Sequence, residues 1–131
     1  MTAPNDRRVI RGTDALTLEH TPGGSAHVFA GEAHGLGAMT FAVVTSPKGG
    51  GTSTHRHPYV QIFLLLDGSG IYCVGDEEIA ANEGDLVIVP SGERHSYCAV
   101  SEQPLVHVEF APVARPKTDR DSPHDGDLLG S

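Results

Sequence analysis

Short apolar runs bounded by turn residues recur along most of the chain. Seven of them are rich in Val, Ile, Phe and Tyr and have Gly, Pro, Asp or Asn at their borders, which is typical of β-strands. They cover residues 26–30, 39–45, 59–66, 70–74, 85–90, 95–100 and 104–112. Windows of a dozen residues show no convincing helical period. The pattern therefore predicts an all-β sandwich or barrel.

Turn and tail signals divide the chain further. The sequence DGSG at residues 67–70 predicts a tight hairpin between its two flanking strands, and GDEE at 75–78 predicts a second turn. Residues 1–8 are polar and contain proline, so we expect a flexible N-terminal segment. Residues 115–131 are charged, rich in Asp and Pro and poor in apolar side chains, which predicts a disordered tail. We therefore expect one β-barrel domain over residues 9–114, between these two segments.

Composition narrows the class of protein. With 131 residues the chain forms one domain that can bury a core without disulfides. Nine basic and 17 acidic residues give a net charge of −8 without a basic cluster, which argues against nucleic acid or an anionic membrane as partner. Cys73 and Cys98 lack redox or metal spacing and indicate reduced thiols. Because no signal core or membrane-length apolar run is present, we expect a cytoplasmic protein.

Alternation along residues 55–65 places polar side chains on an interior face. In an extended chain His55, His57, Tyr59, Gln61, Phe63 and Leu65 point to one side. Large apolar residues mark that side as buried, and two imidazoles one residue apart there can share a metal ion. His95 opens a later strand and shares a face with Tyr97 and Ala99. If the two strands lie near one another, His95 points into the same cavity.

These two stretches resemble the two motifs of the cupin superfamily. The first motif is represented by Gly49, His55, His57, Gln61 and Gly68, with glutamine where the family usually has glutamate. The second is represented by Gly84, Pro90, Gly92, His95 and Ala99, with alanine where the family usually has asparagine. The resemblance implies a small antiparallel jelly-roll barrel with one divalent metal ion inside. It implies His55, His57, His95 and Gln61 as ligands, and leaves Fe, Ni, Cu, Mn and Zn open.

The glutamine at position 61 changes the expected chemistry. Three imidazoles and an amide oxygen are all neutral, so the ion keeps its full charge as a Lewis acid. The motif then also lacks a carboxylate that could serve as general base. Two alternatives stay open: the barrel is metal-free, or Gln61 is a buried amide that bonds a neighbouring side chain while water completes the metal shell.

Other residues are candidates for the site on weaker grounds. Tyr97 shares the face of His95 and is our candidate for a catalytic proton donor, with core packing as the alternative. On the last strand, Val106, Val108 and Phe110 are expected to face the core, which turns His107 and Glu109 outward. In the opposite arrangement Glu109 could supply the missing carboxylate. Three further histidines lack ligand spacing and are expected at the surface: His20, His27 and His34.

Three functions are compatible with these features. The chain resembles small quercetinase-like cupins, which implies a metal-dependent oxygenase of phenolic or enolic substrates. It also resembles cupin-type polyketide cyclases, which implies redox-neutral cyclisation or isomerisation. The third is a non-catalytic metabolite-binding barrel. In each case the partner is a small organic molecule, and we expect a homodimer formed through strand edges or an exchanged N-terminal segment.

Overall fold

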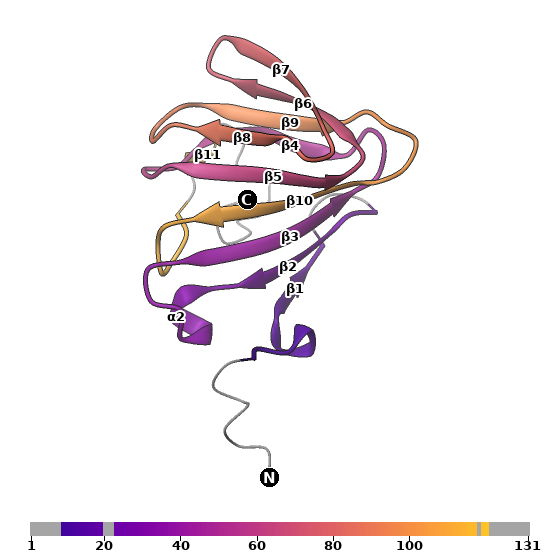
Figure 1. Cartoon of the computed structure of the whole chain (residues 1–131). Helices are drawn as coiled ribbons and strands as arrows, with labels where there is room; N and C mark the ends of the chain where they lie inside the picture. The colour runs from indigo at the N-terminus through magenta and orange to yellow at the C-terminus, as the bar shows by residue number, and fades with distance from the viewer. Residues whose placement is uncertain (1–8, 20–22, 118, 121–131) are drawn as a thin grey trace.

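The computed structural model describes residues 9–19, 23–117 and 119–120, which fold into two antiparallel sheets that face one another (Figure 1). The first sheet has the order β1 (Leu16–Leu18), β2 (Ser25–Phe29), β3 (Thr40–Ser46), β10 (Leu105–Ala111), β5 (Gln61–Asp67) and β8 (Leu86–Val89). The second has the order β11 (Asp119–Arg120), β4 (Gly51–Arg56), β9 (His95–Ala99), β6 (Ser69–Val74) and β7 (Glu77–Asn82). Two short helical turns, η1 (Gly12–Asp14) and α2 (Gly31–His34), complete the described fold.

The apolar pattern predicted the strands with a strong hydrophobic signal. Each of the seven predicted segments contains one strand, from β2 to β10, and the all-β class is confirmed. The strands that the pattern missed are β1, β4, β7 and β11. Their sequences are short or polar, such as GTSTHR in β4 and EEIAAN in β7. Backbone pairing holds these strands in the sheets despite their weak hydrophobic signal.

The predicted hairpin at DGSG is wrong. Strand β5 pairs with β10 and β8, whereas β6 pairs with β7 and β9, so the segment carries the chain from one sheet to the other. Gly68 has φ of 77°, and a Cβ there would lie 2.6 Å from the carbonyl oxygen of Pro104. The glycine is therefore required for a crossing against neighbouring backbone. The second turn is confirmed, because Val74 pairs with Glu77 around Gly75.

The apolar core joins the two sheets. Its larger cluster takes side chains from β5, β8 and β10 of one sheet and β6, β7 and β9 of the other, including Phe63, Leu65, Tyr72 and Leu105. A smaller cluster of Ala and Val side chains lies against β2 and β3. Small side chains in that second cluster leave room beside the polar interior of the barrel.

The ordered chain continues beyond the domain boundary expected at residue 114. Strand β11 pairs with β4 at Arg56 and His55. Pro116 and Lys117, which precede it, contact residues of the barrel interior. Residues 115–117 therefore lie against the barrel, and Asp119–Arg120 extend its second sheet. Residues 1–8 and 121–131, for which we expect flexible tails, lie outside the described residues.

The outer face of the first sheet is apolar over strands β3, β10, β5 and β8. Side chains on β3, β10, β5 and β8 that alternate with the buried positions point away from the barrel. They are Phe41, Val43, Thr45, Val106, Val108, Phe110, Ile62, Leu64, Leu66, Leu86 and Ile88. Several are well exposed, with 57% of the Ile88 surface and 52% of the Leu86 surface accessible. The outer face of the second sheet instead carries Arg56, Glu78 and Ser96.

Candidate metal centre

Three histidines from two neighbouring strands meet inside the barrel. His55 near the end of β4 pairs directly with His95 at the start of β9, and His57 follows β4. The ring centroids are 4.3 Å apart for His55 and His95, 5.0 Å for His55 and His57, and 5.1 Å for His57 and His95. All three side chains are buried, and one nitrogen of each lies within 4.8 Å of the others. The predicted convergence of the three imidazoles is confirmed.

Hydrogen bonds to the backbone orient the three rings. The Nδ1 atoms of His55, His57 and His95 lie 2.8, 2.8 and 3.0 Å from the carbonyl oxygens of Ser53, Lys117 and Glu93. A carbonyl oxygen only accepts, so each Nδ1 carries the hydrogen and donates. In a neutral ring the Nε2 atom then has its lone pair available, which is the tautomer that binds a metal ion with a hydrogen-bonded ring behind it. The chemistry of these donors fits a divalent ion.

Gln61 adds an oxygen to this set. It begins β5 in the facing sheet, is buried, and brings its Oε1 to 3.1 Å from Nε2 of His95. Adjacent ligand atoms around an octahedral ion with bonds of about 2.1 Å are also about 3 Å apart. Its Nε2 donates to Oε1 of Glu109 at 3.4 Å. The amide is thus held with its oxygen toward the histidines, as a ligand would be.

The orientation expected for β10 is wrong. His107 and Glu109 point into the barrel with 0% and 6% of their surfaces exposed, while Val106, Val108 and Phe110 belong to the apolar outer face. The expected orientation is reversed because the apolar side chains of β10 belong to the apolar outer face that β3, β10, β5 and β8 share. The polar positions face inward, where hydrogen-bond partners satisfy them.

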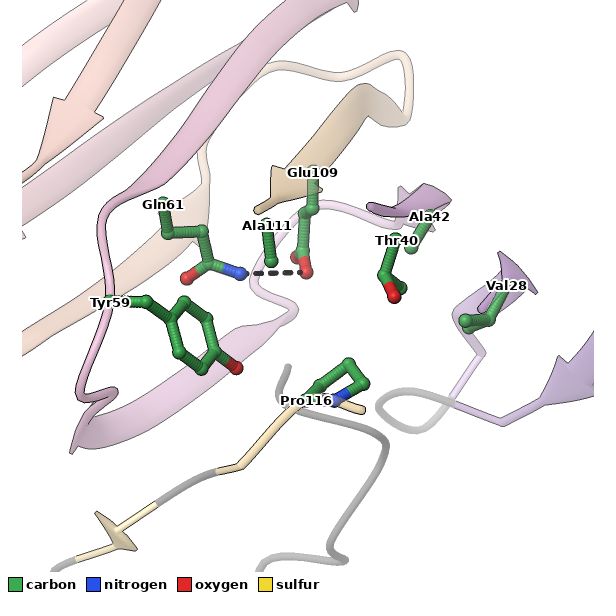
Figure 2. Close-up of a pocket in the computed structure, with 8 residues that line it drawn as sticks. All are labelled: Val28, Thr40, Ala42, Tyr59, Gln61, Glu109, Ala111 and Pro116. Atoms are coloured by element: carbon green, nitrogen blue, oxygen red, sulfur yellow. Dashed lines mark hydrogen bonds between the residues drawn. The ribbon is translucent and has the colours of Figure 1, made fainter. Parts of the chain in front are cut away.

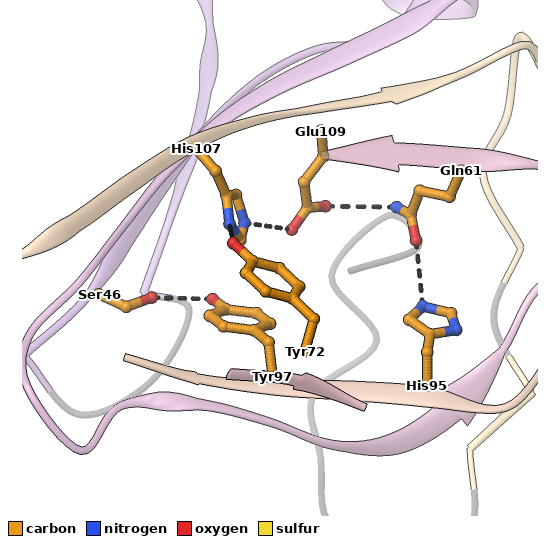
Figure 3. A network of polar contacts seen from close by, with 7 residues as sticks. All are labelled: Ser46, Gln61, Tyr72, His95, Tyr97, His107 and Glu109. Carbon is orange, nitrogen blue, oxygen red and sulfur yellow. Dashed lines mark hydrogen bonds and ion pairs between the residues drawn. The ribbon is translucent and has the colours of Figure 1, made fainter. Parts of the chain in front are cut away.

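Glu109 and His107 form a buried polar network with Gln61 (Figure 3). Oε2 of Glu109 lies 3.1 Å from Nε2 of His107, and Nδ1 of His107 lies 2.6 Å from the hydroxyl of Tyr72. The motif lacks a carboxylate, but the barrel interior contains that of Glu109. It contacts Gln61 on the side away from the histidines. The motif alone suggested that the interior has no carboxylate that could serve as a general base. The structure places one there, that of Glu109.

Tyr97 lies in the core beside this network. Its hydroxyl points to Oγ of Ser46 at 2.8 Å, and its ring packs edge-on against His107 with centroids 4.8 Å apart (Figure 3). Burial, and then the charge of Glu109, raise the pKa of Tyr97, so its phenol stays protonated at neutral pH. Tyr97 shares an inward face with His95 and Ala99, as expected. Its catalytic role stays a prediction.

A pocket opens next to Gln61 and Glu109 (Figure 2). Small or apolar side chains form most of its wall, and Tyr59 stacks on His57 with ring centroids 5.1 Å apart at one side. The lining residues are Val28, Thr40, Ala42, Tyr59, Gln61, Glu109, Ala111 and Pro116. A group that enters this pocket would meet the amide, the carboxyl group and apolar walls.

The residues after Ala114 contribute to the site, although their sequence predicts a disordered tail. The backbone N–H and carbonyl of Lys117 bond the hydroxyl of Tyr59 at 3.0 and 3.1 Å, and the same carbonyl orients His57. Pro116 lines the pocket. These contacts use backbone groups and a proline ring, so the side-chain pattern of a charged segment offered no signal for them.

The remaining predicted residues lie away from the metal centre. His27 is exposed and contacts Thr17, and Nε2 of His34 donates to the carbonyl of Asp14. Cys73 and Cys98 are free thiols, as expected. His20 lies outside the described residues.

Stability is expected to fall above about pH 10 because of the buried phenols. Burial raises the pKa of Tyr72, with the neighbouring Tyr97 adding to the effect, and burial likewise raises that of Tyr97. Both groups stay protonated in the folded chain, whereas the unfolded chain loses these protons from about pH 10 upward. The stabilisation is complete below that pH and is lost above it, by up to about 1.4 kcal/mol per pH unit for each tyrosine. Urea unfolding between about pH 9 and 11 measures it. The Tyr72→Phe/Tyr97→Phe variant should have a flatter profile, and an unchanged slope would contradict this account.

Two facing sheets with three converging imidazoles define a β-barrel protein with a candidate metal centre in its interior. The chain belongs to the cupin family, because the Cupin domain family matches residues 42–110. Curated relatives include the transcriptional activator RhaR of Enterobacter sp. (strain 638), 28% identical over 58 residues, and that of Escherichia coli (strain K12), 24% identical. The match covers 44% of this chain and 21% of the activators, so the chain spans about a fifth of their length.

Solved structures share the fold at low sequence identity. Oxalate decarboxylase from Bacillus subtilis is 19% identical with a TM-score of 0.76, over 85% of this chain and 31% of that one. The polyketide cyclase RemF from Streptomyces resistomycificus is 18% identical with a TM-score of 0.71, over 89% and 87%. KdgF from Halomonas sp. is 18% identical with a TM-score of 0.64, over 78% and 90%. These identities establish the cupin fold alone.

Among the described residues, no helix has the length and apolar character that crossing a membrane requires.

Proposed function

We propose that the protein is a metal-dependent enzyme that acts on a small enolisable or phenolic molecule in redox-neutral carbonyl chemistry such as cyclisation. The observation that carries the proposal is a pocket whose lining includes both Gln61, the fourth candidate ligand, and the carboxyl group of Glu109. The proposed ligands are His55, His57, His95 and Gln61 around one divalent ion. The ion would supply Lewis acidity that polarises a substrate carbonyl.

The other steps of the proposed reaction depend on residues that line the pocket. Small side chains such as Ala42 and Ala111 line the pocket beside Tyr59, and a substrate larger than a water molecule would have to widen it. The carboxylate of Glu109 takes the proton from the carbon next to the carbonyl. That carbon then forms a bond to a second carbonyl carbon of the same molecule, whose oxygen takes up a proton, so no electrons are gained or lost.

The similarity to RemF in both fold and chain length supports cyclisation over oxygenation. RemF is a polyketide cyclase, and the match spans most of both chains. The oxygenase of phenolic or enolic substrates that the sequence favours would use the same ligands and would consume dioxygen. It is the alternative outcome of the experiment below.

The test is turnover of a panel of poly-β-carbonyl compounds and flavonols by protein loaded with Zn²⁺, Fe²⁺ or Ni²⁺. We expect a cyclised product with the mass of the substrate or of the substrate less water, at the same rate with and without dioxygen. The His95→Ala variant serves as the control without a complete metal centre. Products that contain added oxygen, with matching oxygen uptake, would overturn the cyclase and favour the oxygenase.

We further propose a homodimer, formed through the apolar outer face of the first sheet. An uncharged sheet face of this extent is rare on a monomer, and a second copy offers a matching uncharged surface. The sequences of residues 1–8 and 121–131 are predominantly polar and charged, so they offer no extended apolar match for this face. Two such faces can pack as the layers of a β-sandwich do. Strand-edge pairing and exchange of the N-terminal segment are other outcomes of the test.

A further inference from the structure

A directed chain of polar contacts leads to the fourth candidate ligand (Figure 3). It runs from the hydroxyl of Tyr72 on β6 through His107 and Glu109 on β10 to Gln61 on β5, and it ends at His95 on β9. All five side chains are buried, with 6% exposure at most. In such surroundings the direction of each hydrogen bond matters, because a donor facing a donor has no water to relieve it.

The carboxylate fixes these directions. An ionised carboxylate only accepts, so both of its neighbours must donate to it. Gln61 donates through Nε2 to Oε1 of Glu109 at 3.4 Å, and His107 donates through Nε2 to Oε2 at 3.1 Å. The Nδ1 atom of neutral His107 then accepts from the Tyr72 hydroxyl at 2.6 Å. With its NH₂ group bound to the carboxylate, Gln61 must turn its oxygen the other way, toward the three histidines.

We propose that Glu109 is the positioning residue that makes Gln61 a metal ligand and that brings the negative charge which a glutamate at position 61 would bring. The proposal rests on the metal site proposed above. In the usual cupin motif, charge and ligand oxygen belong to one glutamate. In this chain the ligand oxygen belongs to the amide on β5, and the charge lies behind it on β10.

A purely structural role explains only half of the arrangement. The pair with His107 would satisfy Oε2 of Glu109 and hold β10 against Tyr72. The other oxygen faces the Gln61 amide, and the carboxyl group also lines the pocket. Glu109 thus contacts the fourth candidate ligand directly, and its removal must act on that ligand.

Exchanging the two side chains separates positioning from packing. Glu109→Gln removes the negative charge. It also places an NH₂ group opposite one of the two donors, on Gln61 and His107, that the carboxylate now accepts from. The dissociation constant for Co²⁺ should therefore rise roughly 10–100-fold. Gln61→Glu/Glu109→Gln moves the charge to the ligand, and its amide at position 109 can donate to the new carboxylate. We expect this double variant to bind Co²⁺ at least as tightly as the wild type. Gln61→Glu alone places two carboxylates together and should lower the melting temperature of the metal-free protein.

Calorimetric titration with Co²⁺, together with the visible spectrum of the bound ion, provides a readout that is independent of activity. Glu102→Gln is the matched control, since Glu102 is exposed and pairs with Lys48 at the surface. Equal Co²⁺ affinity of Glu109→Gln and wild type would overturn the proposal. The proposal would also be overturned if Glu109→Gln weakened Co²⁺ binding equally in the wild type and in the Gln61→Glu variant. That result would assign Glu109 a packing role only. If the wild type bound no Co²⁺ at all, the metal site itself would fail, and that result is distinguishable from both.

Discussion

Replacing His95 with alanine is expected to remove the bound divalent ion almost completely. His95 lies at the centre of the site, 4.3 Å from His55 and 5.1 Å from His57 between ring centroids, and its Nε2 faces the oxygen of Gln61. Without the imidazole of His95, the donors of His55, His57 and Gln61 no longer surround one position for an ion. The loss of affinity should exceed the roughly 10–100-fold that follows when a hydrogen-bond partner behind a ligand is removed. Metal per chain, measured by elemental analysis after dialysis, should fall from about one to near zero.

A matched variant separates this effect from the general loss of a histidine. His27→Ala removes an exposed imidazole of β2 and should keep the wild-type metal content. Added Zn²⁺ should raise the melting temperature of the wild type and of His27→Ala, because a ligand that binds only the folded state stabilises it. The same rise in His95→Ala, or an unchanged metal content, would show that the ion binds elsewhere.

Charges placed on the apolar outer face are expected to convert a dimer into a monomer. Leu64 and Ile88 lie on the adjacent strands β5 and β8, with exposed fractions of 38% and 57%. Leu64→Lys/Ile88→Lys would bury four ammonium groups without partners in a face-to-face dimer, which is far more costly than leaving them in water. Because both positions are exposed in one chain, folding should be little affected. Light scattering should report twice the chain mass for the wild type and the single mass for the variant at micromolar concentration.

The control places the same charge on the other sheet. Ala80→Lys lies on β7, whose exposed positions belong to the second sheet, and should leave the mass of the dimer unchanged. A monomeric wild type would contradict the proposed dimer. The apolar face would then be a candidate binding surface for a different protein. A double variant that stays dimeric would favour strand-edge pairing or an exchanged N-terminal segment.

The fold could be predicted where hydrophobic bulk marks a strand. Seven segments rich in branched and aromatic residues became strands, and the spacing of His55, His57 and His95 correctly predicted the cluster. Strands such as β4 and β7 were missed because pairing, and not side-chain hydrophobicity, holds them. The chain reversal expected at DGSG was instead a crossing between sheets, since short-range turn chemistry does not determine the sheet to which the next strand belongs.

The least predictable part was the facing of β10. Its alternation offered Val106, Val108 and Phe110 on one side and His107 and Glu109 on the other, and the apolar side was assigned to the core. This assignment is wrong because strands β3, β10, β5 and β8 present an apolar face toward solvent and polar groups toward the histidine cluster. A strand with an apolar outer face and a polar interior face reverses the usual pattern. The glutamine at position 61, where the motif usually has glutamate, was the one sequence signal that a carboxyl group could come from another strand.

The role of the segment after Ala114 could not be predicted for a similar reason. Its charged composition indicated disorder, yet the carbonyl of Lys117 orients His57 and Pro116 lines the pocket. Backbone groups carry these contacts, and they depend on where the chain passes. The pocket is therefore completed by residues whose side chains give no indication of it.

The convergence of the three imidazoles on one cation is tested most directly by anomalous diffraction from crystals grown with Co²⁺. This account predicts one strong peak between the rings of His55, His57 and His95, about 2.0–2.3 Å from each Nε2 and from the oxygen of Gln61. Crystals of the cobalt-treated protein without a peak between these rings, or with its peaks only at surface carboxylates, would contradict it.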